Sequence, residues 1–203
     1  MINLSISLIL AYLIGSIPTS FIFGKILKNI DIRKHGSGNV GATNVFRVAG
    51  KIPALIVLLL DIFKGSFAVL FLPEVFFNNA IGITIGFEVY QILLGLFVIS
   101  GHVWSVFLKF KGGKGVATTA GVILVLAPKI LIGSLFIWIL VFLAFRIVSV
   151  ASITASIFLP IFAIIFHRPI YMVLFCVLLC IFGTYKHKSN IKRLIRGEEK
   201  KLF

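Results

Sequence analysis

The chain has 203 residues, of which 60% are hydrophobic and only 13% are charged, and its mean hydropathy is +1.14. This composition excludes a soluble globular domain and indicates an integral membrane protein. The formal net charge is +14, from 20 Lys and Arg against 6 Asp and Glu. Acidic partners are therefore expected, either phosphate groups or the anionic face of a bilayer, and no nucleic acid is expected.

Apolar segments long enough to form membrane-spanning helices recur along the whole chain. A helix needs about 20 apolar residues to cross a bilayer, so these runs predict an all-α, polytopic membrane protein with about seven transmembrane helices. The fourth run is short and begins in a glycine-rich stretch, which suits a tilted or half-buried helix. Pro128 and Pro169 predict tight turns into the fifth and seventh runs. The predicted spans are residues 4–24, 52–72, 81–100, 116–128, 129–145, 147–166 and 169–185.

Basic residues gather on one side of these predicted spans. The first, third and fifth connections and the C-terminal tail together hold 17 of the 20 Lys and Arg residues. By the positive-inside rule that side is cytoplasmic, so the N-terminus is predicted outside and the C-terminus inside. The sequence shows no internal repeat, and residues 1–203 are predicted to form a single integral membrane domain.

The stretch GSGNVGATNVFR, residues 36–47, fits the dinucleotide-binding pattern G-x-G-x-x-G, and Asp61 follows Gly41 by twenty residues. That pattern needs a strand before the glycines and a helix on a parallel sheet after them. Here a predicted membrane helix precedes the glycines and Asp61 falls inside the next apolar run, so a dinucleotide site is excluded. The stretch LKFKGGKGVATT is not a Walker A loop either, because Leu108 and Gly115 replace the first glycine and the Ser or Thr.

Two glycine-rich segments on the predicted cytoplasmic side instead have the chemistry of anion cradles. Glycines let backbone N–H groups approach an anion, a helix N-terminus adds partial positive charge, and Lys or Arg completes the pocket. Helix packing and topology could account for the glycines and basic residues, but not for the neutral polar residues gathered there. Two cradles predict two phosphate groups. The first offers Ser37, Asn39, Thr43, Asn44 and Arg47 among Gly36, Gly38 and Gly41, and the second offers His102, Lys114, Thr118 and Thr119 around Gly112, Gly113 and Gly115.

Two further segments reach the same predicted face. Ser149 and Ser152 lie one helical turn apart, and either ligand contact or a hydrogen bond to the carbonyl one turn back would account for them. His187 and Asn190 lie at i, i+3 just beyond the last predicted span. The basic residues that follow are typical of a tail at lipid headgroups.

Asp61 and Lys64 stand at i, i+3 inside the second predicted span, where ionisable residues are costly. A functional role is the general expectation at that depth, but the spacing allows mutual neutralisation, so we favour a structural pair. Cys176 and Cys180 lie one turn apart with no histidine at ligand spacing. Neither a disulfide nor a metal site is therefore expected.

The stretches GSGNVGATNVFRVAGK, GHVWSVFLKFKGGKGVAT and RIVSVASI resemble the three cytoplasmic motifs of the bacterial membrane glycerol-3-phosphate acyltransferases that use acyl phosphate as donor. The similarity covers nearly the whole chain, including DIFKG in the second predicted span and HKSNIKRL in the tail. It implies a seven-helix protein of the bacterial cytoplasmic (inner) membrane with its active site facing the cytoplasm. Two positions depart from the family's pattern, since Ser105 replaces a usual proline and Ile147 a usual aromatic residue.

By this resemblance the protein transfers an acyl group from acyl phosphate to the 1-hydroxyl of glycerol 3-phosphate, giving lysophosphatidic acid and phosphate, with no cofactor. The partners implied are the two substrates and membrane lipid. The donor's acyl chain would lie between helices. The residues expected to contact substrate phosphates are Ser37, Asn39, Thr43, Asn44, Arg47, Gly112, Gly113, Gly115, Ser149 and Asn190, and the catalytic candidates are His102, Lys114 and His187.

Acyl phosphate is an activated mixed anhydride, so proximity and stabilisation of negative charge are the main catalytic demands. His102 and His187 are the candidate bases, and for the family the leaving phosphate itself has been proposed to accept the proton. The His-x-x-x-x-Asp arrangement of CoA-dependent acyltransferases is absent, because Phe107 and Lys192 stand at the fifth positions after the two histidines. Acyl-CoA is therefore not expected as donor.

A transporter of a phosphorylated solute is the competing hypothesis, since basic glycine loops and broken helices would serve it equally well. It predicts polar residues that continue through the bilayer. Apart from Asp61, Lys64 and Glu88, the polar residues stop at one predicted face, which favours the enzyme.

Overall fold

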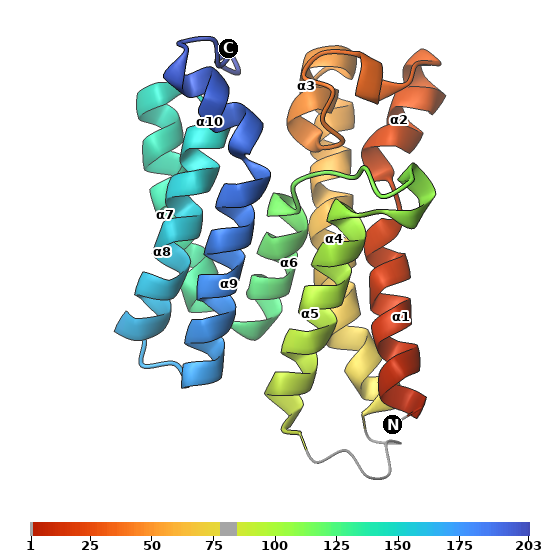
Figure 1. The fold of residues 1–203 in the computed structure, drawn as a ribbon, viewed down its shortest axis with the longest axis vertical. Helices are drawn as coiled ribbons and strands as arrows, with labels where there is room; N and C mark the ends of the chain where they lie inside the picture. The colour runs from red at the N-terminus through yellow and green to blue at the C-terminus, as the bar shows by residue number, and fades with distance from the viewer. Residues whose placement is uncertain (1, 78–84) are drawn as a thin grey trace. The chain divides into compact units, whose positions relative to one another are not determined.

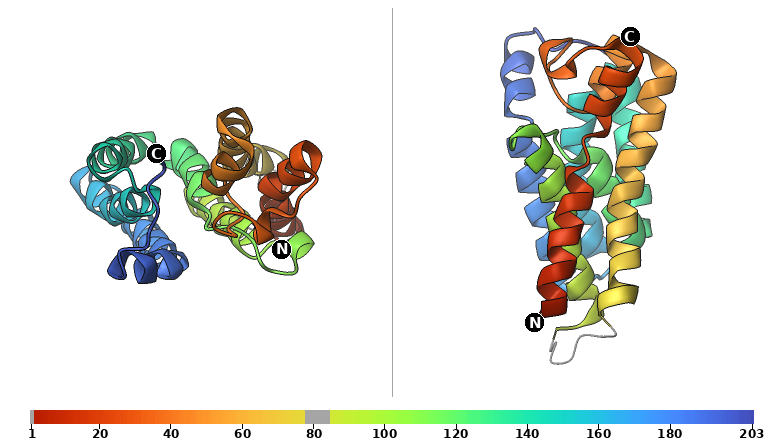
Figure 2. Two further views of the ribbon diagram at one scale, coloured as in Figure 1. Left: turned by 90° about the horizontal axis from the view of Figure 1, so that it is seen from above. Right: turned by 90° about the vertical axis from the view of Figure 1, so that its right-hand side faces the viewer.

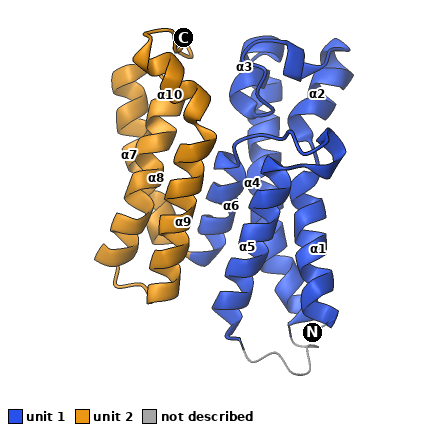
Figure 3. Cartoon of the chain, viewed as in Figure 1, with its two compact units in different colours: residues 1–126 blue, residues 127–203 orange. Residues whose placement is uncertain are grey.

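The computed structural model describes residues 2–77 and 85–203, and every regular element in those ranges is helical (Figure 1). The chain divides into two compact units, residues 1–126 and 127–203 (Figure 3). Unit 1 contains α1 (Ile2–Ser16), α2 (Thr19–Lys28), the 3-10 helix η1 (Ile32–Lys34), α3 (Ala42–Ala49), α4 (Lys51–Phe76), α5 (Phe87–Val103), the 3-10 helix η2 (Val106–Leu108) and α6 (Val116–Leu126). Unit 2 contains α7 (Pro128–Phe145), α8 (Val148–Ile165), α9 (Ile170–Lys186) and α10 (Lys188–Ile195).

The all-α, polytopic class predicted from composition is confirmed. Every predicted apolar run coincides with helix, the first with both α1 and α2 and each later run with one helix, and residues 81–84 of the third run lie outside the described residues. Among the described residues, five stretches are long and apolar enough to cross a bilayer, and the pair α9 and α10, bent by 56°, makes a sixth. The helix α6 has only 11 residues, in keeping with the short fourth run. The five stretches are Ile2–Lys28, Lys51–Phe76, Phe87–Leu108, Pro128–Phe145 and Val148–Ile165.

Glycines allow the helices of unit 1 to pack closely. A Cβ added at Gly101 on α5 would collide with the Tyr12 carbonyl of α1, and one at Gly121 on α6 would collide with the Ile62 carbonyl of α4. Small residues of this kind let membrane helices approach backbone to backbone. The helices α1 and α4 also lie side by side, as the right-hand view of Figure 2 shows.

The first predicted span is broken into α1 and α2 at Ile17 and Pro18. Because α1 ends there, the carbonyls of Ser16 and Ile17 have no intrahelical donor, and the Thr19 N–H donates to the Ile17 carbonyl at 3.1 Å. The Ser105 hydroxyl donates to the Ser16 carbonyl at 2.6 Å, and the Lys64 ammonium donates to the Ile17 carbonyl at 3.2 Å. Side chains from two other segments therefore satisfy the backbone at the break, as hydrocarbon surroundings require.

A small hydrophobic cluster holds η1 and α3, the two elements that flank the first glycine segment. It joins η1, α3 and α4, and its members are almost completely buried. Because α3 has eight residues, its position depends on this packing and not on its own helical stability. The cluster consists of Ile32, Val45, Ala54 and Val57, with Phe23, Ala42, Phe46 and Ala49 packed against it.

Unit 2 is built on α7, α8 and α9, which run side by side (Figures 1 and 2). The predicted turns are confirmed, because Pro128 is the first residue of α7 and Pro169 directly precedes α9. At the other end of the unit, α7 ends at Arg146, whose φ of 60° lies in the left-handed region. The chain then enters α8 at once, which brings Ser149 into its first turn.

Replacement of Gly121 by Val tests the close packing of α6 on α4. The added side chain has no space beside the Ile62 carbonyl, so we expect the free energy of unfolding to fall by about 1–3 kcal/mol. Thermal unfolding in lipid would measure the change. Gly86→Ala is the control, because a Cβ there meets none of the described residues within 4 Å, and equal unfolding temperatures for the two variants would contradict the packing argument.

Candidate functional site

The first glycine segment, residues 36–41, forms a turn held by one buried amide side chain. Asn44, on α3, is fully buried. Its Oδ1 accepts from the Ser37 N–H at 2.7 Å, and its Nδ2 donates to the Ile32 and His35 carbonyls at 3.1 and 3.0 Å. Gly36 lies directly against this amide with a φ of 59°, a conformation that favours glycine. Asn44 thus determines the shape of the turn.

The other polar residues predicted for this cradle lie at its surface. Ser37 is exposed, and Asn39, Thr43 and Arg47 are half-buried. Thr43 and Arg47 stand four residues apart on α3 and therefore share one face of the helix. The segment offers a hydroxyl, an amide and a guanidinium, which are donors suited to a phosphate.

The second glycine segment, residues 112–115, folds back onto the end of α5. The Gly112 N–H donates to the Val103 carbonyl and the Gly113 N–H to the His102 carbonyl, each at 3.1 Å. Gly115 has a φ of 83° and directly precedes α6. The half-buried Lys114 lies between Gly113 and Gly115. It is next to the N-terminus of α6, where an anion is stabilised.

The two glycine segments adjoin each other in unit 1. A Cβ added at Gly113 would collide with both the Val40 carbonyl of the first segment and Nε2 of His102. The structure therefore brings together the two cradles that the sequence predicted separately. It also shows a reason for glycine at positions 112 and 113 that does not involve a ligand, namely the lack of space for a side chain.

A buried polar cluster lies below the second segment. Asp61, on α4, is 1% exposed, and its Oδ1 lies 2.8 Å from Lys64 Nζ and 2.7 Å from the Thr19 hydroxyl. His102, on α5, has Nδ1 3.7 Å from the same oxygen and 3.1 Å from the Thr118 hydroxyl. The sequence predicted the Asp61–Lys64 pair, and the structure confirms it, but the participation of Thr19, His102 and Thr118 depends on tertiary contacts.

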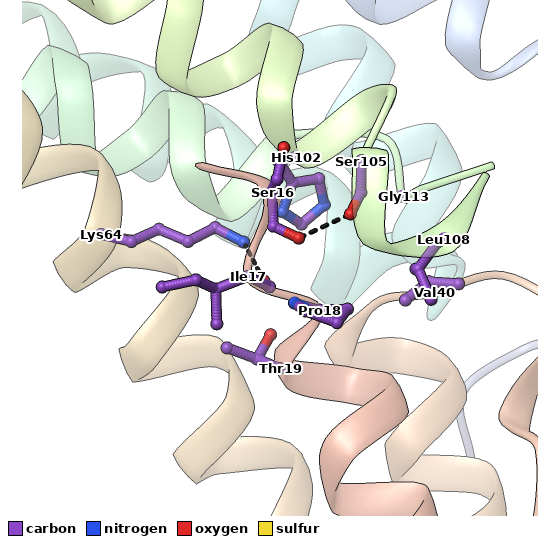
Figure 4. Close-up of a pocket in the computed structure, with 10 residues that line it drawn as sticks. All are labelled: Ser16, Ile17, Pro18, Thr19, Val40, Lys64, His102, Ser105, Leu108 and Gly113. Carbon is purple, nitrogen blue, oxygen red and sulfur yellow. Dashed lines mark hydrogen bonds between the residues drawn. The ribbon is translucent and has the colours of Figure 1, made fainter. Parts of the chain in front are cut away.

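A small pocket opens beside this cluster (Figure 4). Figure 4 shows Lys64, His102 and Ser105 around the break between α1 and α2. The backbone at Ser105 has a φ of −60°, the value that proline adopts. The departure from the usual proline at Ser105 therefore leaves the local geometry compatible with proline and adds a hydrogen bond to Ser16. The lining residues are Ser16, Ile17, Pro18, Thr19, Val40, Lys64, His102, Ser105, Leu108 and Gly113.

In unit 2, the predicted residues Ser149 and Asn190 meet at a carboxylate. The Ser149 hydroxyl and the Asn190 amide both donate to Oε1 of Glu199, the former at 2.8 Å, and Arg193 Nε donates to Oε2 at 2.6 Å. Burial raises the pKa of Glu199, but these three donors outweigh it, so the pKa lies below its ordinary value. Glu199 could not be recognised from the sequence, where its one signal is a carboxylate within a strongly basic tail.

His187 lies at the bend between α9 and α10 and is 3% exposed. Its Nδ1 lies 2.8 Å from the Gly183 carbonyl. A carbonyl can only accept, so Nδ1 carries a proton and the lone pair of the neutral ring is at Nε2. The tail closes over the same end of the unit, where the Leu202 N–H donates to the Arg146 carbonyl at 2.9 Å.

Ser152, the second hydroxyl of its pair, has a different environment. Its Oγ accepts from the Trp138 indole at 3.1 Å, on the neighbouring helix α7. Through this hydrogen bond Ser152 links α8 to α7. The sequence had left open whether Ser149 or Ser152 faces a ligand.

Comparisons with known proteins agree with this architecture. Residues 5–197 match the family model "Glycerol-3-phosphate acyltransferase". The chain is 47% identical to glycerol-3-phosphate acyltransferase 2 of Moorella thermoacetica, over 97% of this chain and 96% of that protein. It is 44% identical to the glycerol-3-phosphate acyltransferase of Staphylococcus haemolyticus, again over 97% of this chain and 96% of that protein.

Two solved structures are similar along almost the entire chain. Both are crystal structures of PlsY (YgiH), described as an integral membrane glycerol 3-phosphate acyltransferase. The glycerol 3-phosphate form has a TM-score of 0.87 at 37% identity, and the lysophosphatidic acid form has 0.84 at 36%. Each match covers 98% of this chain and 94% of the other.

Replacement of Asn44 by Ala tests its role in the first glycine segment. Three hydrogen bonds to the turn are lost, so we expect the Ser37 amide proton to exchange with solvent at least about tenfold faster, because local opening costs less free energy. Hydrogen exchange in lipid would measure this. Thr43→Ala on the same helix is the control, and unchanged Ser37 exchange in the Asn44 variant would contradict the scaffold role.

Replacement of Glu199 by Gln tests the cluster in unit 2. We expect the free energy of unfolding at neutral pH to fall by about 1–3 kcal/mol, because a charged acceptor of three donors is lost. Since the folded-state pKa is lowered, the stabilisation is complete above the ordinary value of 4.5 and is lost as the pH falls through the lower folded-state value.

Unfolding temperatures between pH 7 and pH 3 would show this dependence for the unsubstituted chain and a smaller dependence for Glu199→Gln. The neighbouring, exposed Glu198 provides the control variant Glu198→Gln. Equal pH profiles for the two variants would contradict the assignment.

Proposed function

Since the chain belongs to the glycerol-3-phosphate acyltransferase family, we propose that it transfers an acyl group from acyl phosphate to the 1-hydroxyl of glycerol 3-phosphate. A bond forms between the acyl carbon and the hydroxyl oxygen, and the bond between that carbon and the phosphate oxygen breaks. The products are lysophosphatidic acid and inorganic phosphate. Family membership also decides against the transporter hypothesis.

The observation that carries the proposal is the contact between the two glycine segments at Val40 and Gly113. Both substrates carry a phosphate, and two adjoining cradles can hold two phosphates near each other. Arg47 and Lys114 are the cations of the respective segments. Positioning of the two reactants and stabilisation of the developing negative charge would together supply most of the rate enhancement.

The individual residues take different roles within this proposal. Ser37, Asn39, Thr43 and Arg47 would donate to one phosphate, and Lys114 with the N-terminus of α6 to the other. Asn44, Gly112 and Gly113 would act by shaping the segments, because their polar groups described above are bonded within the chain. For unit 2 by itself, Ser149, His187 and Asn190 stay proposed substrate contacts, and Ser149 and Asn190 would have to release Glu199 to make them.

Two carboxylates outside the membrane spans, Asp31 and Glu199, are poor candidates for a general base. The Arg33 guanidinium binds Asp31 at 2.7 Å and lowers the pKa of that carboxyl to about 2. Glu199 is held ionised by Ser149, Asn190 and Arg193. A base with so low a pKa accepts a proton weakly at neutral pH, which supports the leaving phosphate as the proton acceptor.

His187 is the histidine better suited to assist. With Nδ1 donating to the Gly183 carbonyl, Nε2 carries the lone pair of the neutral ring, which is the chemistry of an acceptor for a hydroxyl. We propose that it orients the glycerol hydroxyl. His102, also a catalytic candidate, lies beneath Gly113 with Nδ1 facing Asp61 and Thr118, which suits a role in support of the loop.

The protein is an integral, multi-pass membrane protein. We propose that it functions as one domain over residues 1–203, that it lies in the bacterial cytoplasmic membrane, and that both glycine segments and the tail face the cytoplasm. The concentration of 17 of its 20 basic residues in the connections and the C-terminal tail on that side supports this orientation.

Phosphate release by the purified protein in lipid tests the reaction. With palmitoyl phosphate as donor, we expect release that depends on glycerol 3-phosphate and falls by about 100-fold or more in Lys114→Ala, because a charge-stabilising donor is lost. Lys111→Ala is the matched control, since Lys111 is an exposed lysine of the same loop, and it should retain activity.

A parallel arm with palmitoyl-CoA distinguishes the donors. We expect no lysophosphatidic acid from that arm. Equal turnover with the CoA donor would refute acyl phosphate as the substrate, and no glycerol-3-phosphate-dependent release in any arm would refute the proposed reaction.

A further inference from the structure

Asp61 has contacts that an ion pair with Lys64 alone does not require. Its Oδ1 accepts from the Thr19 hydroxyl on α2 at 2.7 Å and from Lys64 on the same helix at 2.8 Å. The same oxygen lies 3.7 Å from Nδ1 of His102 on α5, a distance that makes an electrostatic contact but no hydrogen bond. One carboxylate therefore acts on side chains from three helices.

His102 connects this carboxylate to the second glycine segment. Its main-chain carbonyl accepts from the Gly113 N–H at 3.1 Å, and Nε2 of its ring lies against the α-carbon of Gly113. On the opposite side of the ring, Nδ1 faces Asp61 and the Thr118 hydroxyl. Because His102 is only 9% exposed and packed on both sides, a rotation of its ring would displace Gly113.

We propose that Asp61 is a positioning residue for the acyl transfer, which orients the His102 ring and thereby places the Gly113–Lys114 segment against the substrate phosphate. The proposal rests on the proposed function, because it takes Lys114 as a phosphate-binding cation. Lys114 follows Gly113 directly, so a displacement of the segment moves its ammonium. Displacements of about 1 Å at a substrate-positioning group can cost about 100-fold in rate.

The alternative hypothesis, that Asp61 and Lys64 form only a structural ion pair, predicts a different result. Buried pairs can often be replaced by neutral groups of similar size without loss of stability, whereas removal of one partner leaves an uncompensated charge. The double variant Asp61→Asn/Lys64→Met removes both charges and keeps the approximate volumes. If Asp61 only neutralises Lys64, this variant should recover both stability and activity relative to Asp61→Asn.

The experiment compares the unfolding temperature, kcat and the KM for palmitoyl phosphate among full-length variants in lipid. We expect Asp61→Asn to lower the unfolding temperature and to raise KM. The double variant should regain part of the unfolding temperature, since the Ile17 carbonyl still lacks its Lys64 donor, but should keep a KM raised at least about tenfold. Thr118→Val should also raise KM, because it removes the second contact to His102 Nδ1 without exposing a charge.

Ser66→Ala is the matched control on α4. Its hydroxyl donates to the Gly121 carbonyl at 2.9 Å and not to Asp61 or His102, so the substitution should affect the unfolding temperature and leave KM unchanged. A double variant that recovers both properties, or a Thr118→Val variant with unchanged KM, would overturn the proposal. If Asp61→Asn does not fold, the double variant and Thr118→Val still distinguish a positioning role of Asp61 from a purely structural one.

The glycerol-3-phosphate-dependent release by the unsubstituted protein separates the two proposals. Its absence would refute the proposed function. Its presence together with an unchanged KM in Thr118→Val would refute the role of Asp61 alone.

Discussion

The break between α1 and α2 in the first membrane-spanning stretch leaves the carbonyls of Ser16 and Ile17 without intrahelical donors. The Thr19 N–H donates to the Ile17 carbonyl at 3.1 Å, and side chains complete the hydrogen bonding, as hydrocarbon surroundings require. The donors come from Ser105, after α5, and from Lys64, on α4. Lys64 in turn needs an anion, which is Asp61, and the oxygen of Asp61 faces His102 below the second glycine segment. The backbone break, the buried charges and the second cradle are therefore connected by one series of hydrogen bonds and electrostatic contacts.

Glycine has two different uses in unit 1. At Gly101 and Gly121 the missing side chain allows helices to approach each other's carbonyls. At Gly113 it allows one loop to lie between the ring of His102 and the Val40 carbonyl of the other loop. A pattern of glycines that looks like a ligand-binding loop can thus be required by packing as well, and the two requirements are compatible at the same residue.

In unit 2, Ser149 and Asn190 bind a carboxylate of the tail, whereas the sequence predicted that they contact a substrate phosphate. Glu199 binds Ser149, Asn190 and Arg193, and Leu202 closes the tail onto Arg146. Tail residues that read as a basic segment at lipid headgroups therefore also include an ordered element. Its stability depends on a charge that persists well below neutral pH.

The fold class, the approximate membrane spans and one buried ion pair could be predicted from the sequence alone. Long apolar runs must form helices in a bilayer, because only helices satisfy the backbone locally there, and so the class, the approximate spans and the turns at Pro128 and Pro169 were predictable. The motifs carried the family resemblance, and the spacing of Asp61 and Lys64 predicted their pairing. These features depend on composition or on residues within a turn or two of each other.

Contacts between residues far apart in the chain could not be predicted from the sequence and are known from the tertiary structure alone. The meeting of Val40 with Gly113, the approach of His102 to Asp61, and the convergence of Ser149 and Asn190 on Glu199 depend on how helices pack. Hydrophobic periodicity does not encode such distances in a chain that is apolar on nearly every helix face. The sequence could therefore predict two separate anion cradles, while only helix packing could bring them together.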